Sequence, residues 1–158
     1  MLKNLSNLFS SGPYLVQFSR HCLKLTNLST NQVWENDPLV AIDDSTKGKP
    51  IIAAIGAAAK GKTNLVVNPF DHPRVFISDF TLAEALLKYA LRELMPKHFL
   101  TVSPKLILHV LDVLEGGITQ LEKRALREMA LGAGARAVYF WENESSPTLK
   151  ETQALKKL

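Results

Sequence analysis

A strand–helix–strand pattern in the second half of the chain constrains the fold more than any other feature. Residues 105–111 (KLILHVL) and 137–141 (AVYFW) are short apolar runs with the length and composition of buried strands. Between them, residues 120–131 place apolar side chains at helical spacing, and Thr119 with Glu122 predicts a capping box at the helix start. Two strands joined by a helix run parallel in one sheet. We therefore expect an α/β fold with a partly parallel sheet.

Short apolar stretches in the first half of the chain predict further strands. Residues 14–42 contain three of them, YLVQF, CLKL and PLVAI, which are separated by Asn, Ser and Asp residues. Residues 51–55 (IIAAI) form a fourth. We expect these runs to be strands joined by turns.

Two more helices are expected outside the strand–helix–strand unit. Residues 81–94 (TLAEALLKYALREL) carry an apolar stripe, and Pro96 stops this helix. Thr81 and Glu84 have the spacing of a capping box at its start. Residues 148–158 predict a short final helix from the spacing of their leucines.

The composition is that of an ordinary globular chain and argues against a nucleic-acid partner. The 158 residues fall within the size of one domain, with 46% hydrophobic and 22% charged residues. The formal net charge of +4 comes from 19 basic and 15 acidic residues that are interspersed along the chain. Nucleic-acid binding is usually marked by a basic stripe with stacking aromatics. We therefore expect no nucleic-acid binding.

Cysteine usage and hydropathy indicate a cytoplasmic protein without a metal site. Cys22 is the only cysteine, so an internal disulfide is excluded, and no His or Cys lies near it at the spacing of a zinc site. No apolar run approaches the roughly 18 residues that span a bilayer, and the start of the chain lacks a signal-peptide pattern. The expected protein is neither secreted nor membrane-spanning.

The first ten residues (MLKNLSNLFS) predict a short amphipathic helix, which Gly12 and Pro13 break. This helix either docks on the domain's own core or lies in the plane of a membrane surface. One helix of this length binds a membrane weakly, so firm attachment would require assembly into multimers. The candidate membrane-contact residues are Leu2, Leu5, Leu8 and Phe9.

Residues 56–63 (GAAAKGKT) satisfy the phosphate-loop pattern G-x-x-x-x-G-K-[ST] and follow a predicted strand. The candidate nucleotide-binding residues would be Gly56, Gly61, Lys62 and Thr63. A working phosphate loop runs into a helix whose N-terminal N–H groups hold the phosphates, whereas here NLVVNP follows. We therefore favour a loop in a small β-rich lobe. A small nucleotide hydrolase that uses this loop is the alternative.

Several segments resemble the family of the bacterial actin homologue MreB. Residues 118–142 (ITQLEKRALREMALGAGARAVYFWE) are similar to the family's helix with E-R-R-A-x-x-E and its following G-A-x-x-V. MLKNLSNLFS is similar to the family's amphipathic N-terminus. ENDPLVAID resembles its N-E-P-S-x-V-A-I strand, and VFISDFTLAEALLKY its V-I-A-D-F helix entry. The resemblance covers roughly residues 1–143 and the first half of the family pattern.

This resemblance implies an actin-like ATPase architecture of the ribonuclease-H type, in which helices flank a mixed sheet. It divides the chain into an amphipathic N-terminal segment (1–12), a first lobe (13–143) with a small insert at about 33–72, and a divergent C-terminal tail or helix (144–158). It also implies a cytoskeletal filament under the inner membrane that guides cell-wall synthesis in rod-shaped bacteria.

Departures from the family pattern fall on its nucleotide chemistry. Where the family has its first phosphate loop, D-L-G-T-x-N-T, residues 17–23 read QFSRHCL, without the acid or the glycine. Asn143 stands where the family places the Glu that positions the attacking water, although a shift of one residue would bring Glu142 or Glu144 there. Residues 112–117 lengthen the connection before the next helix by about three residues relative to the family pattern. Only one wall of a nucleotide cleft is expected.

The favoured hypothesis is a non-catalytic MreB-like protein of the cytoskeleton or cell-shape apparatus, with no cofactor and no enzymatic activity. Its expected partners are an actin-like filament subunit or a second copy of itself, and the inner-membrane surface, at which it would be a peripheral cytoplasmic protein. A degenerate fragment without a selected function is a further alternative.

Overall fold

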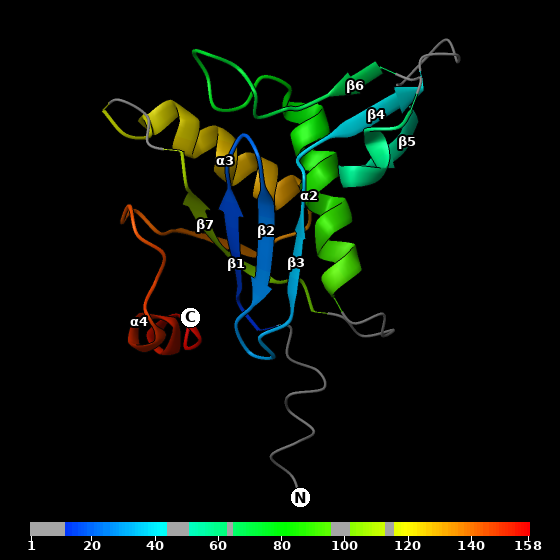
Figure 1. Ribbon diagram of the computed structural model, residues 1–158. Helices are drawn as coiled ribbons and strands as arrows, with labels where there is room; N and C mark the ends of the chain where they lie inside the picture. Colours follow the sequence, from blue (N-terminus) through cyan, green and yellow to red (C-terminus); the bar gives the residue numbers. More distant parts are fainter. Residues whose placement is uncertain (1–11, 44–50, 63–64, 96–101, 113–115) are drawn as a thin grey trace, which may run out of the picture.

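The computed structural model describes residues 12–43, 51–62, 65–95, 102–112 and 116–158 (Figure 1). The predicted terminal helix over residues 1–10, with Leu2, Leu5, Leu8 and Phe9, therefore lies outside the described residues, as does Thr63. None of the described helices combines the length and apolar character needed to cross a membrane.

A five-stranded mixed sheet forms the centre of the molecule, with strand order β3-β2-β1-β7-β8. The first three strands are antiparallel neighbours, whereas β7 is parallel to both β1 and β8. The strands are β1 (Tyr14–Phe18), β2 (Leu23–Asn27), β3 (Val33–Asn36), β7 (Lys105–Val110) and β8 (Ala137–Phe140). The predicted α/β class with a partly parallel sheet is confirmed.

A smaller antiparallel sheet has the order β5-β4-β6 and lies near one end of the larger sheet (Figure 1). Its strands are β4 (Val40–Asp43), β5 (Ile51–Ile55) and β6 (Leu65–Val67), and the 3₁₀ turn η2 (Gly56–Ala59) follows β5 directly. All three strands fall inside the predicted insert of 33–72, whereas β3 at its start pairs with β2 in the larger sheet.

Helices α2 (Phe80–Leu94) and α3 (Gln120–Gly132) pack on one face of the large sheet (Figure 1). Thr119 and Glu122 form the predicted capping box of α3. The box predicted at Thr81 and Glu84 is wrong, because the Asp79 side chain accepts from the N–H of Leu82 and starts α2 earlier. Both residues then lie inside the helix, and neither is the flanking residue whose side chain caps it.

The main core lies between the large sheet and these two helices. Alternate residues of β1, such as Val16 and Phe18, face α2 and α3 and are fully buried, as are Leu86 and Leu126 of the helices. A smaller apolar cluster of Leu15, Leu28 and Ile107 covers the opposite face of β1 and β7. Two side chains from the segment after β8 pack against it: Trp141, and Leu155 at the end of the short helix α4 (Leu149–Leu155). Strand β1 is therefore buried on both faces.

Candidate functional site

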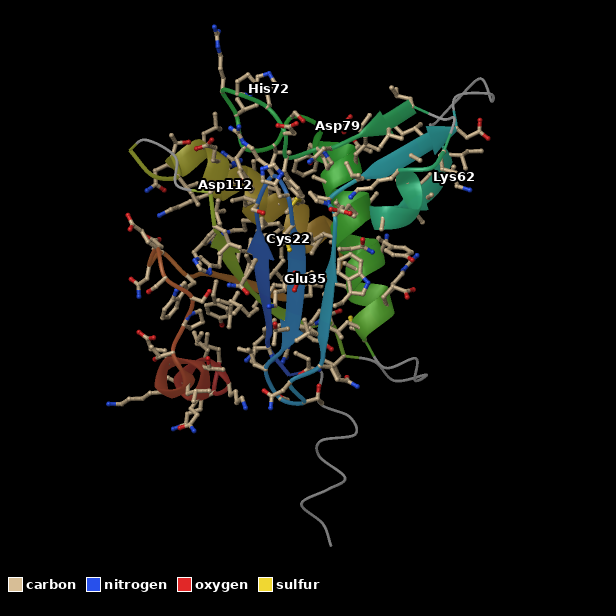
Figure 2. The ribbon with its side chains drawn as sticks, viewed as in Figure 1. Cys22, Glu35, Lys62, His72, Asp79 and Asp112 are labelled. Atoms are coloured by element: carbon tan, nitrogen blue, oxygen red, sulfur yellow. The ribbon has the colours of Figure 1, made fainter. Side chains whose placement is uncertain are left out.

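The candidate site lies at the edge where the parallel strands β1, β7 and β8 end, which we call the carboxyl edge. The register pairs Phe18 with Val110 and Leu108 with Phe140, so the three strands end side by side. Figure 2 shows Cys22, His72 and Asp112 at this end of the molecule, and Lys62 far from it beside the small sheet. In open α/β sheets, ligands bind outside such an edge.

The β1–β2 turn at this edge is closed by acceptors of the protein itself. The Oγ of Ser19 accepts from the backbone N–H groups of His21 at 3.2 Å and Cys22 at 2.9 Å. The backbone N–H of Arg20 donates to Oδ2 of Asp112 at 2.7 Å. The N–H of Ser19 donates to the carbonyl of Cys22 at 2.8 Å. A bound anion would have to displace these acceptors to reach any N–H group of residues 19–22.

The turn is also tied to the loop between β6 and α2. The side-chain amide of Asn68 donates to the carbonyl of Arg20 at 2.7 Å, and the Arg20 guanidinium donates to the carbonyl of His72 at 3.1 Å. At the base of the turn, the N–H of Leu111 donates to the carbonyl of Phe18 at 2.8 Å and joins β7 to β1. Two separate segments of the chain, residues 68–72 and 111–112, therefore hold this turn in place.

An aromatic cluster fills the space beneath the turn. The Phe18 ring meets Phe70 edge-to-face with centroids 5.6 Å apart, and Phe76 with centroids 6.2 Å apart. Phe70 and Phe76 stack on each other at 5.4 Å. All three side chains are buried, and such aromatic pairs add packing energy beyond their burial. Phe18 thus belongs to the core rather than to an open cleft.

A cavity of ≈ 500 Å³ lies beside the turn, between the ends of β7 and β8 and the start of α3. Its acidic lining side chains are Asp112, Glu142 and Glu144, and its only cation among the described residues is Lys123, which pairs with Glu142 at 2.7 Å. An excess of carboxylates repels a polyphosphate unless a metal ion intervenes. Within the described residues, no three His, Cys, Asp or Glu side chains gather to hold a metal ion.

The candidates for a catalytic acid lie on the segment after β8 that lines this cavity. Asn143 and Glu144 are exposed, and Glu142 is held by the Lys123 ammonium group. Placed this way, Asn143 can hold a water molecule but cannot accept its proton at neutral pH.

A buried polar cluster on the opposite face of β1 and β7 was not predicted from the sequence. The Gln17 side-chain amide donates to Oγ of Ser146 at 2.9 Å and lies 3.2 Å from Nδ1 of His109. Burial lowers the pKa of His109, and the carbonyl groups of Asn143 and Glu144 oppose this effect only partly. The imidazole is therefore neutral at pH 7. Its Nε2 has no hydrogen-bond partner among the described residues.

The thiol of Cys22 is not activated for chemistry. Burial raises the pKa of Cys22, and the neighbouring carboxylate of Glu35 raises it further. The thiolate is the nucleophilic form, so a raised pKa leaves this side chain inert at neutral pH.

The segment that matches the phosphate-loop pattern forms η2 and the turn after it, at a distance from the carboxyl edge (Figure 2). Gly56 has a φ of +68°, and the Asn36 side chain packs against it, with its Oδ1 accepting from the Ala57 N–H at 2.8 Å. The next described element is strand β6 rather than a helix. The backbone N–H groups of Gly56, Ala57, Lys60 and Lys62 each have an acceptor inside the protein.

The fold of this chain is shared with a solved structure. A crystal structure of MreB5 of Spiroplasma citri bound to AMPPNP superposes with a TM-score of 0.65, covering 84% of this chain and 39% of that chain at 24% identity. The fold is therefore that of the actin-like proteins.

Sequence comparison gives the family within this class. A family model described as MreB/Mbl protein matches residues 29–148. The chain belongs to the MreB/Mbl family. The cell shape-determining protein MreB of Pasteurella multocida is 34% identical over 117 residues, or 70% of this chain and 32% of the relative. The corresponding protein of Escherichia coli is 36% identical over 115 residues, or 68% and 31%. This chain thus spans about a third of the length of these curated relatives.

Proposed function

We propose that this chain is a non-catalytic MreB-like protein that contributes to cell shape or the bacterial cytoskeleton by binding a partner rather than by hydrolysing a nucleotide. The closed β1–β2 turn is the observation that carries this proposal. Phosphate groups are held by free backbone N–H groups, and those of Arg20, His21 and Cys22 already donate to Asp112 and Ser19. A nucleotide would have to break these hydrogen bonds to bind here.

The chemistry of the neighbouring residues supports the same proposal. Gln17 stands where the family pattern has an acidic residue, and it is engaged with Ser146 and His109 on the far face of the sheet. Asn143 cannot act as the general base that takes a proton from an attacking water molecule. We therefore expect phosphate release from ATP to stay at the buffer background.

The alternative of a nucleotide hydrolase based on residues 56–63 has weaker support. Four of the loop's N–H groups, those of Gly56, Ala57, Lys60 and Lys62, already have acceptors in the protein, and the next described element is a strand rather than a helix. Under that alternative, Lys62→Ala would abolish an activity present in the wild type. We expect instead no activity in either protein.

The proposed partners are a full-length filament protein of the same family, a second copy of this chain, or the inner-membrane surface. Relatives of this chain bear the name cell shape-determining protein, which favours a filament partner. A role at the membrane would use Leu2, Leu5, Leu8 and Phe9, and it would make the protein peripheral and cytoplasmic. No nucleic-acid partner is proposed, because the charges are interspersed.

Co-sedimentation with polymerised full-length MreB tests the filament partner. We expect the chain to pellet with the filaments and to stay in solution with unpolymerised subunits. Once the filaments have formed, further nucleotide should not change the amount of this chain in the pellet. Equal recovery in the supernatant with and without filaments would contradict the filament role.

Two further experiments separate the remaining possibilities. Flotation with anionic vesicles should carry the wild type more than a Leu5→Glu/Leu8→Glu variant if the N-terminal segment binds the membrane. Cells that lack the gene or overproduce it should show opposite changes in shape. Normal shape in both strains would favour a fragment without a selected function.

A further inference from the structure

A second hollow, which we call the basic groove, lies between the small sheet and α2, away from the carboxyl edge. It has a volume of ≈ 660 Å³ and runs between β5 with η2 on one wall and α2 on the other. Figure 1 shows η2 beside α2, and Figure 2 places Lys62 on the small-sheet side. Apolar side chains of β5, together with Ala58 and Ala85, form much of the groove's lining.

Three cations line the basic groove without an opposing charge. Lys62 comes from the small-sheet wall, and Lys88 and Arg92 come from α2. All three are exposed, and none forms an ion pair with another described residue. No acidic side chain is among the described residues that line the groove.

Nearby charges do not offset these cations. The nearby carboxylate of Asp37 is paired with Lys60 at 2.8 Å, and neither residue lines the groove. Glu84, one helical turn before Lys88 on α2, has its carboxylate against Gly132 of α3 and forms no ion pair with Lys88 in the structure. The positive charge of the groove is therefore left for a ligand from outside.

We propose that the basic groove binds an acidic amphipathic segment of a partner protein. Lys88 and Arg92 are one helical turn apart, about 6 Å along the α2 axis, which matches carboxylates spaced one turn apart on a bound helix. Lys62 meets a further carboxylate from the other wall. Apolar side chains of the segment pack on β5 and on the face of Tyr89, which is 40% exposed and held edge-to-face by Trp34.

The geometry favours such a segment over a small phosphate ligand. A phosphate group is held by converging N–H donors, whereas the N–H groups of Ala57, Lys60 and Lys62 already have acceptors inside the protein. The cations stand on two walls with apolar surface between them.

Two segments of this chain, residues 1–11 and 156–158, have the wrong charge to fill the basic groove. Residues 1–11 carry Lys3 and no acidic residue, and the chain finishes with Lys156 and Lys157 before Leu158. An acidic partner segment therefore has the charge complementarity that these two segments lack.

Fluorescence anisotropy with labelled synthetic peptides tests the proposal on the full chain. The test peptides are helical, with a leucine stripe and Glu residues one helical turn apart, and they differ in where the Glu residues stand relative to the stripe. The control peptides have Gln or Lys in place of Glu. The groove variant is Lys88→Glu/Arg92→Glu, and the matched control is Arg124→Glu/Arg136→Glu, which reverses two exposed cations outside the groove. Circular dichroism establishes that all variants fold.

We expect at least one Glu peptide to bind the wild type and the control alike, and the groove variant at least about tenfold more weakly. Binding should weaken with added salt, and amide shifts in NMR spectra should concentrate in residues 52–62 and 85–92. Three results would overturn the proposal. They are no binding by any Glu peptide at about 100 μM, equal binding by the groove variant, and displacement of the peptide by equimolar tripolyphosphate. Self-association of the wild type that the groove variant lacks would instead identify a second copy as the occupant.

Discussion

The backbone N–H of Arg20 donates to the carboxylate of Asp112 at 2.7 Å, although the two residues are 92 positions apart in the chain. The contact joins the β1–β2 turn to the segment that follows β7. In a phosphate-binding turn, such a backbone N–H donates to a negatively charged phosphate oxygen. Here the negatively charged acceptor is the carboxylate of Asp112. The protein thus satisfies this turn from within.

Removal of the Asp112 carboxylate should destabilise the turn. For Asp112→Ala we expect a loss of about 1–2 kcal/mol in the free energy of unfolding, because the Arg20 N–H loses a charged acceptor at a half-buried site. Urea unfolding measures this loss. Asp71→Ala, at an exposed position, is the control and should change stability by less than about 0.5 kcal/mol. Equal effects of the two substitutions would show that the contact contributes nothing specific.

The aromatic cluster beneath the turn should contribute strongly to stability. Phe18→Ala should cost about 3–5 kcal/mol in the free energy of unfolding, because it leaves a cavity beside the stacked rings of Phe70 and Phe76. This is a large part of the total stability of a typical domain, so Phe18→Leu serves as a milder variant with an expected cost below about 2 kcal/mol. Phe80→Ala, at a position that is 41% exposed, is the matched control. A Phe18→Ala protein as stable as the Phe80→Ala protein would contradict the packing described.

The two glycines of the phosphate-loop pattern should respond differently to alanine. Gly56 has a positive φ, and a Cβ there would overlap the Asn36 side chain, whereas a Cβ at Gly61 would meet open space. Thermal or urea unfolding should show a loss of about 1–3 kcal/mol for Gly56→Ala and a change within about 0.5 kcal/mol for Gly61→Ala. Comparable losses at both positions would point to a shared role of the two glycines that the structure does not explain.

Stability should fall in mild acid because of His109. Its folded-state pKa lies below the ordinary value of 6.5, so the unfolded chain binds a proton more readily than the folded one. The contribution of neutral His109 to the free energy of unfolding is therefore fully present above about pH 6.5. It is lost as the pH falls below that value, with a slope of up to about 1.4 kcal/mol per pH unit.

The variant His109→Gln should lose this part of the pH dependence, and His21→Gln, at an exposed position, should keep it. Urea unfolding between pH 5 and pH 8 measures both. A steep slope that persists in His109→Gln would assign the acid sensitivity to another group.

The strand–helix–strand unit could be predicted from the sequence because its signals are local. The predicted strand at residues 105–111, helix at 120–131 and strand at 137–141 each end within one residue of β7, α3 and β8. Apolar periodicity and the Thr119 cap are properties of neighbouring residues, so they do not depend on the rest of the fold.

Strand β3 and the start of α2 could not be predicted in this way, because they depend on context that the spacing of residues does not contain. Strand β3 reads VWEN and has exposed residues alternating with half-buried ones, so it lacks the apolar run that marks a strand. At α2 two possible caps lie two residues apart, and the local pattern does not decide between Asp79 and Thr81. The edge strand and the true cap are therefore visible only in the folded chain.

The closure of the candidate site was beyond local prediction for the same reason. The absence of the family's acid and glycine from residues 17–23 is visible in the sequence, but the acceptor of the Arg20 N–H comes from the segment after β7, 92 positions along the chain. Ser19 is a residue type that often accepts hydrogen bonds from the backbone just after it, which is the one local signal of this turn. The His109 cluster forms only when β1, β7 and the segment after β8 meet.

Isothermal titration calorimetry with ATP and magnesium tests the central claim most directly. The account predicts that the full chain gives no heat beyond dilution, with or without magnesium, because the N–H groups of the β1–β2 turn are already bonded to Ser19 and Asp112. Micromolar ATP binding that requires magnesium would contradict it.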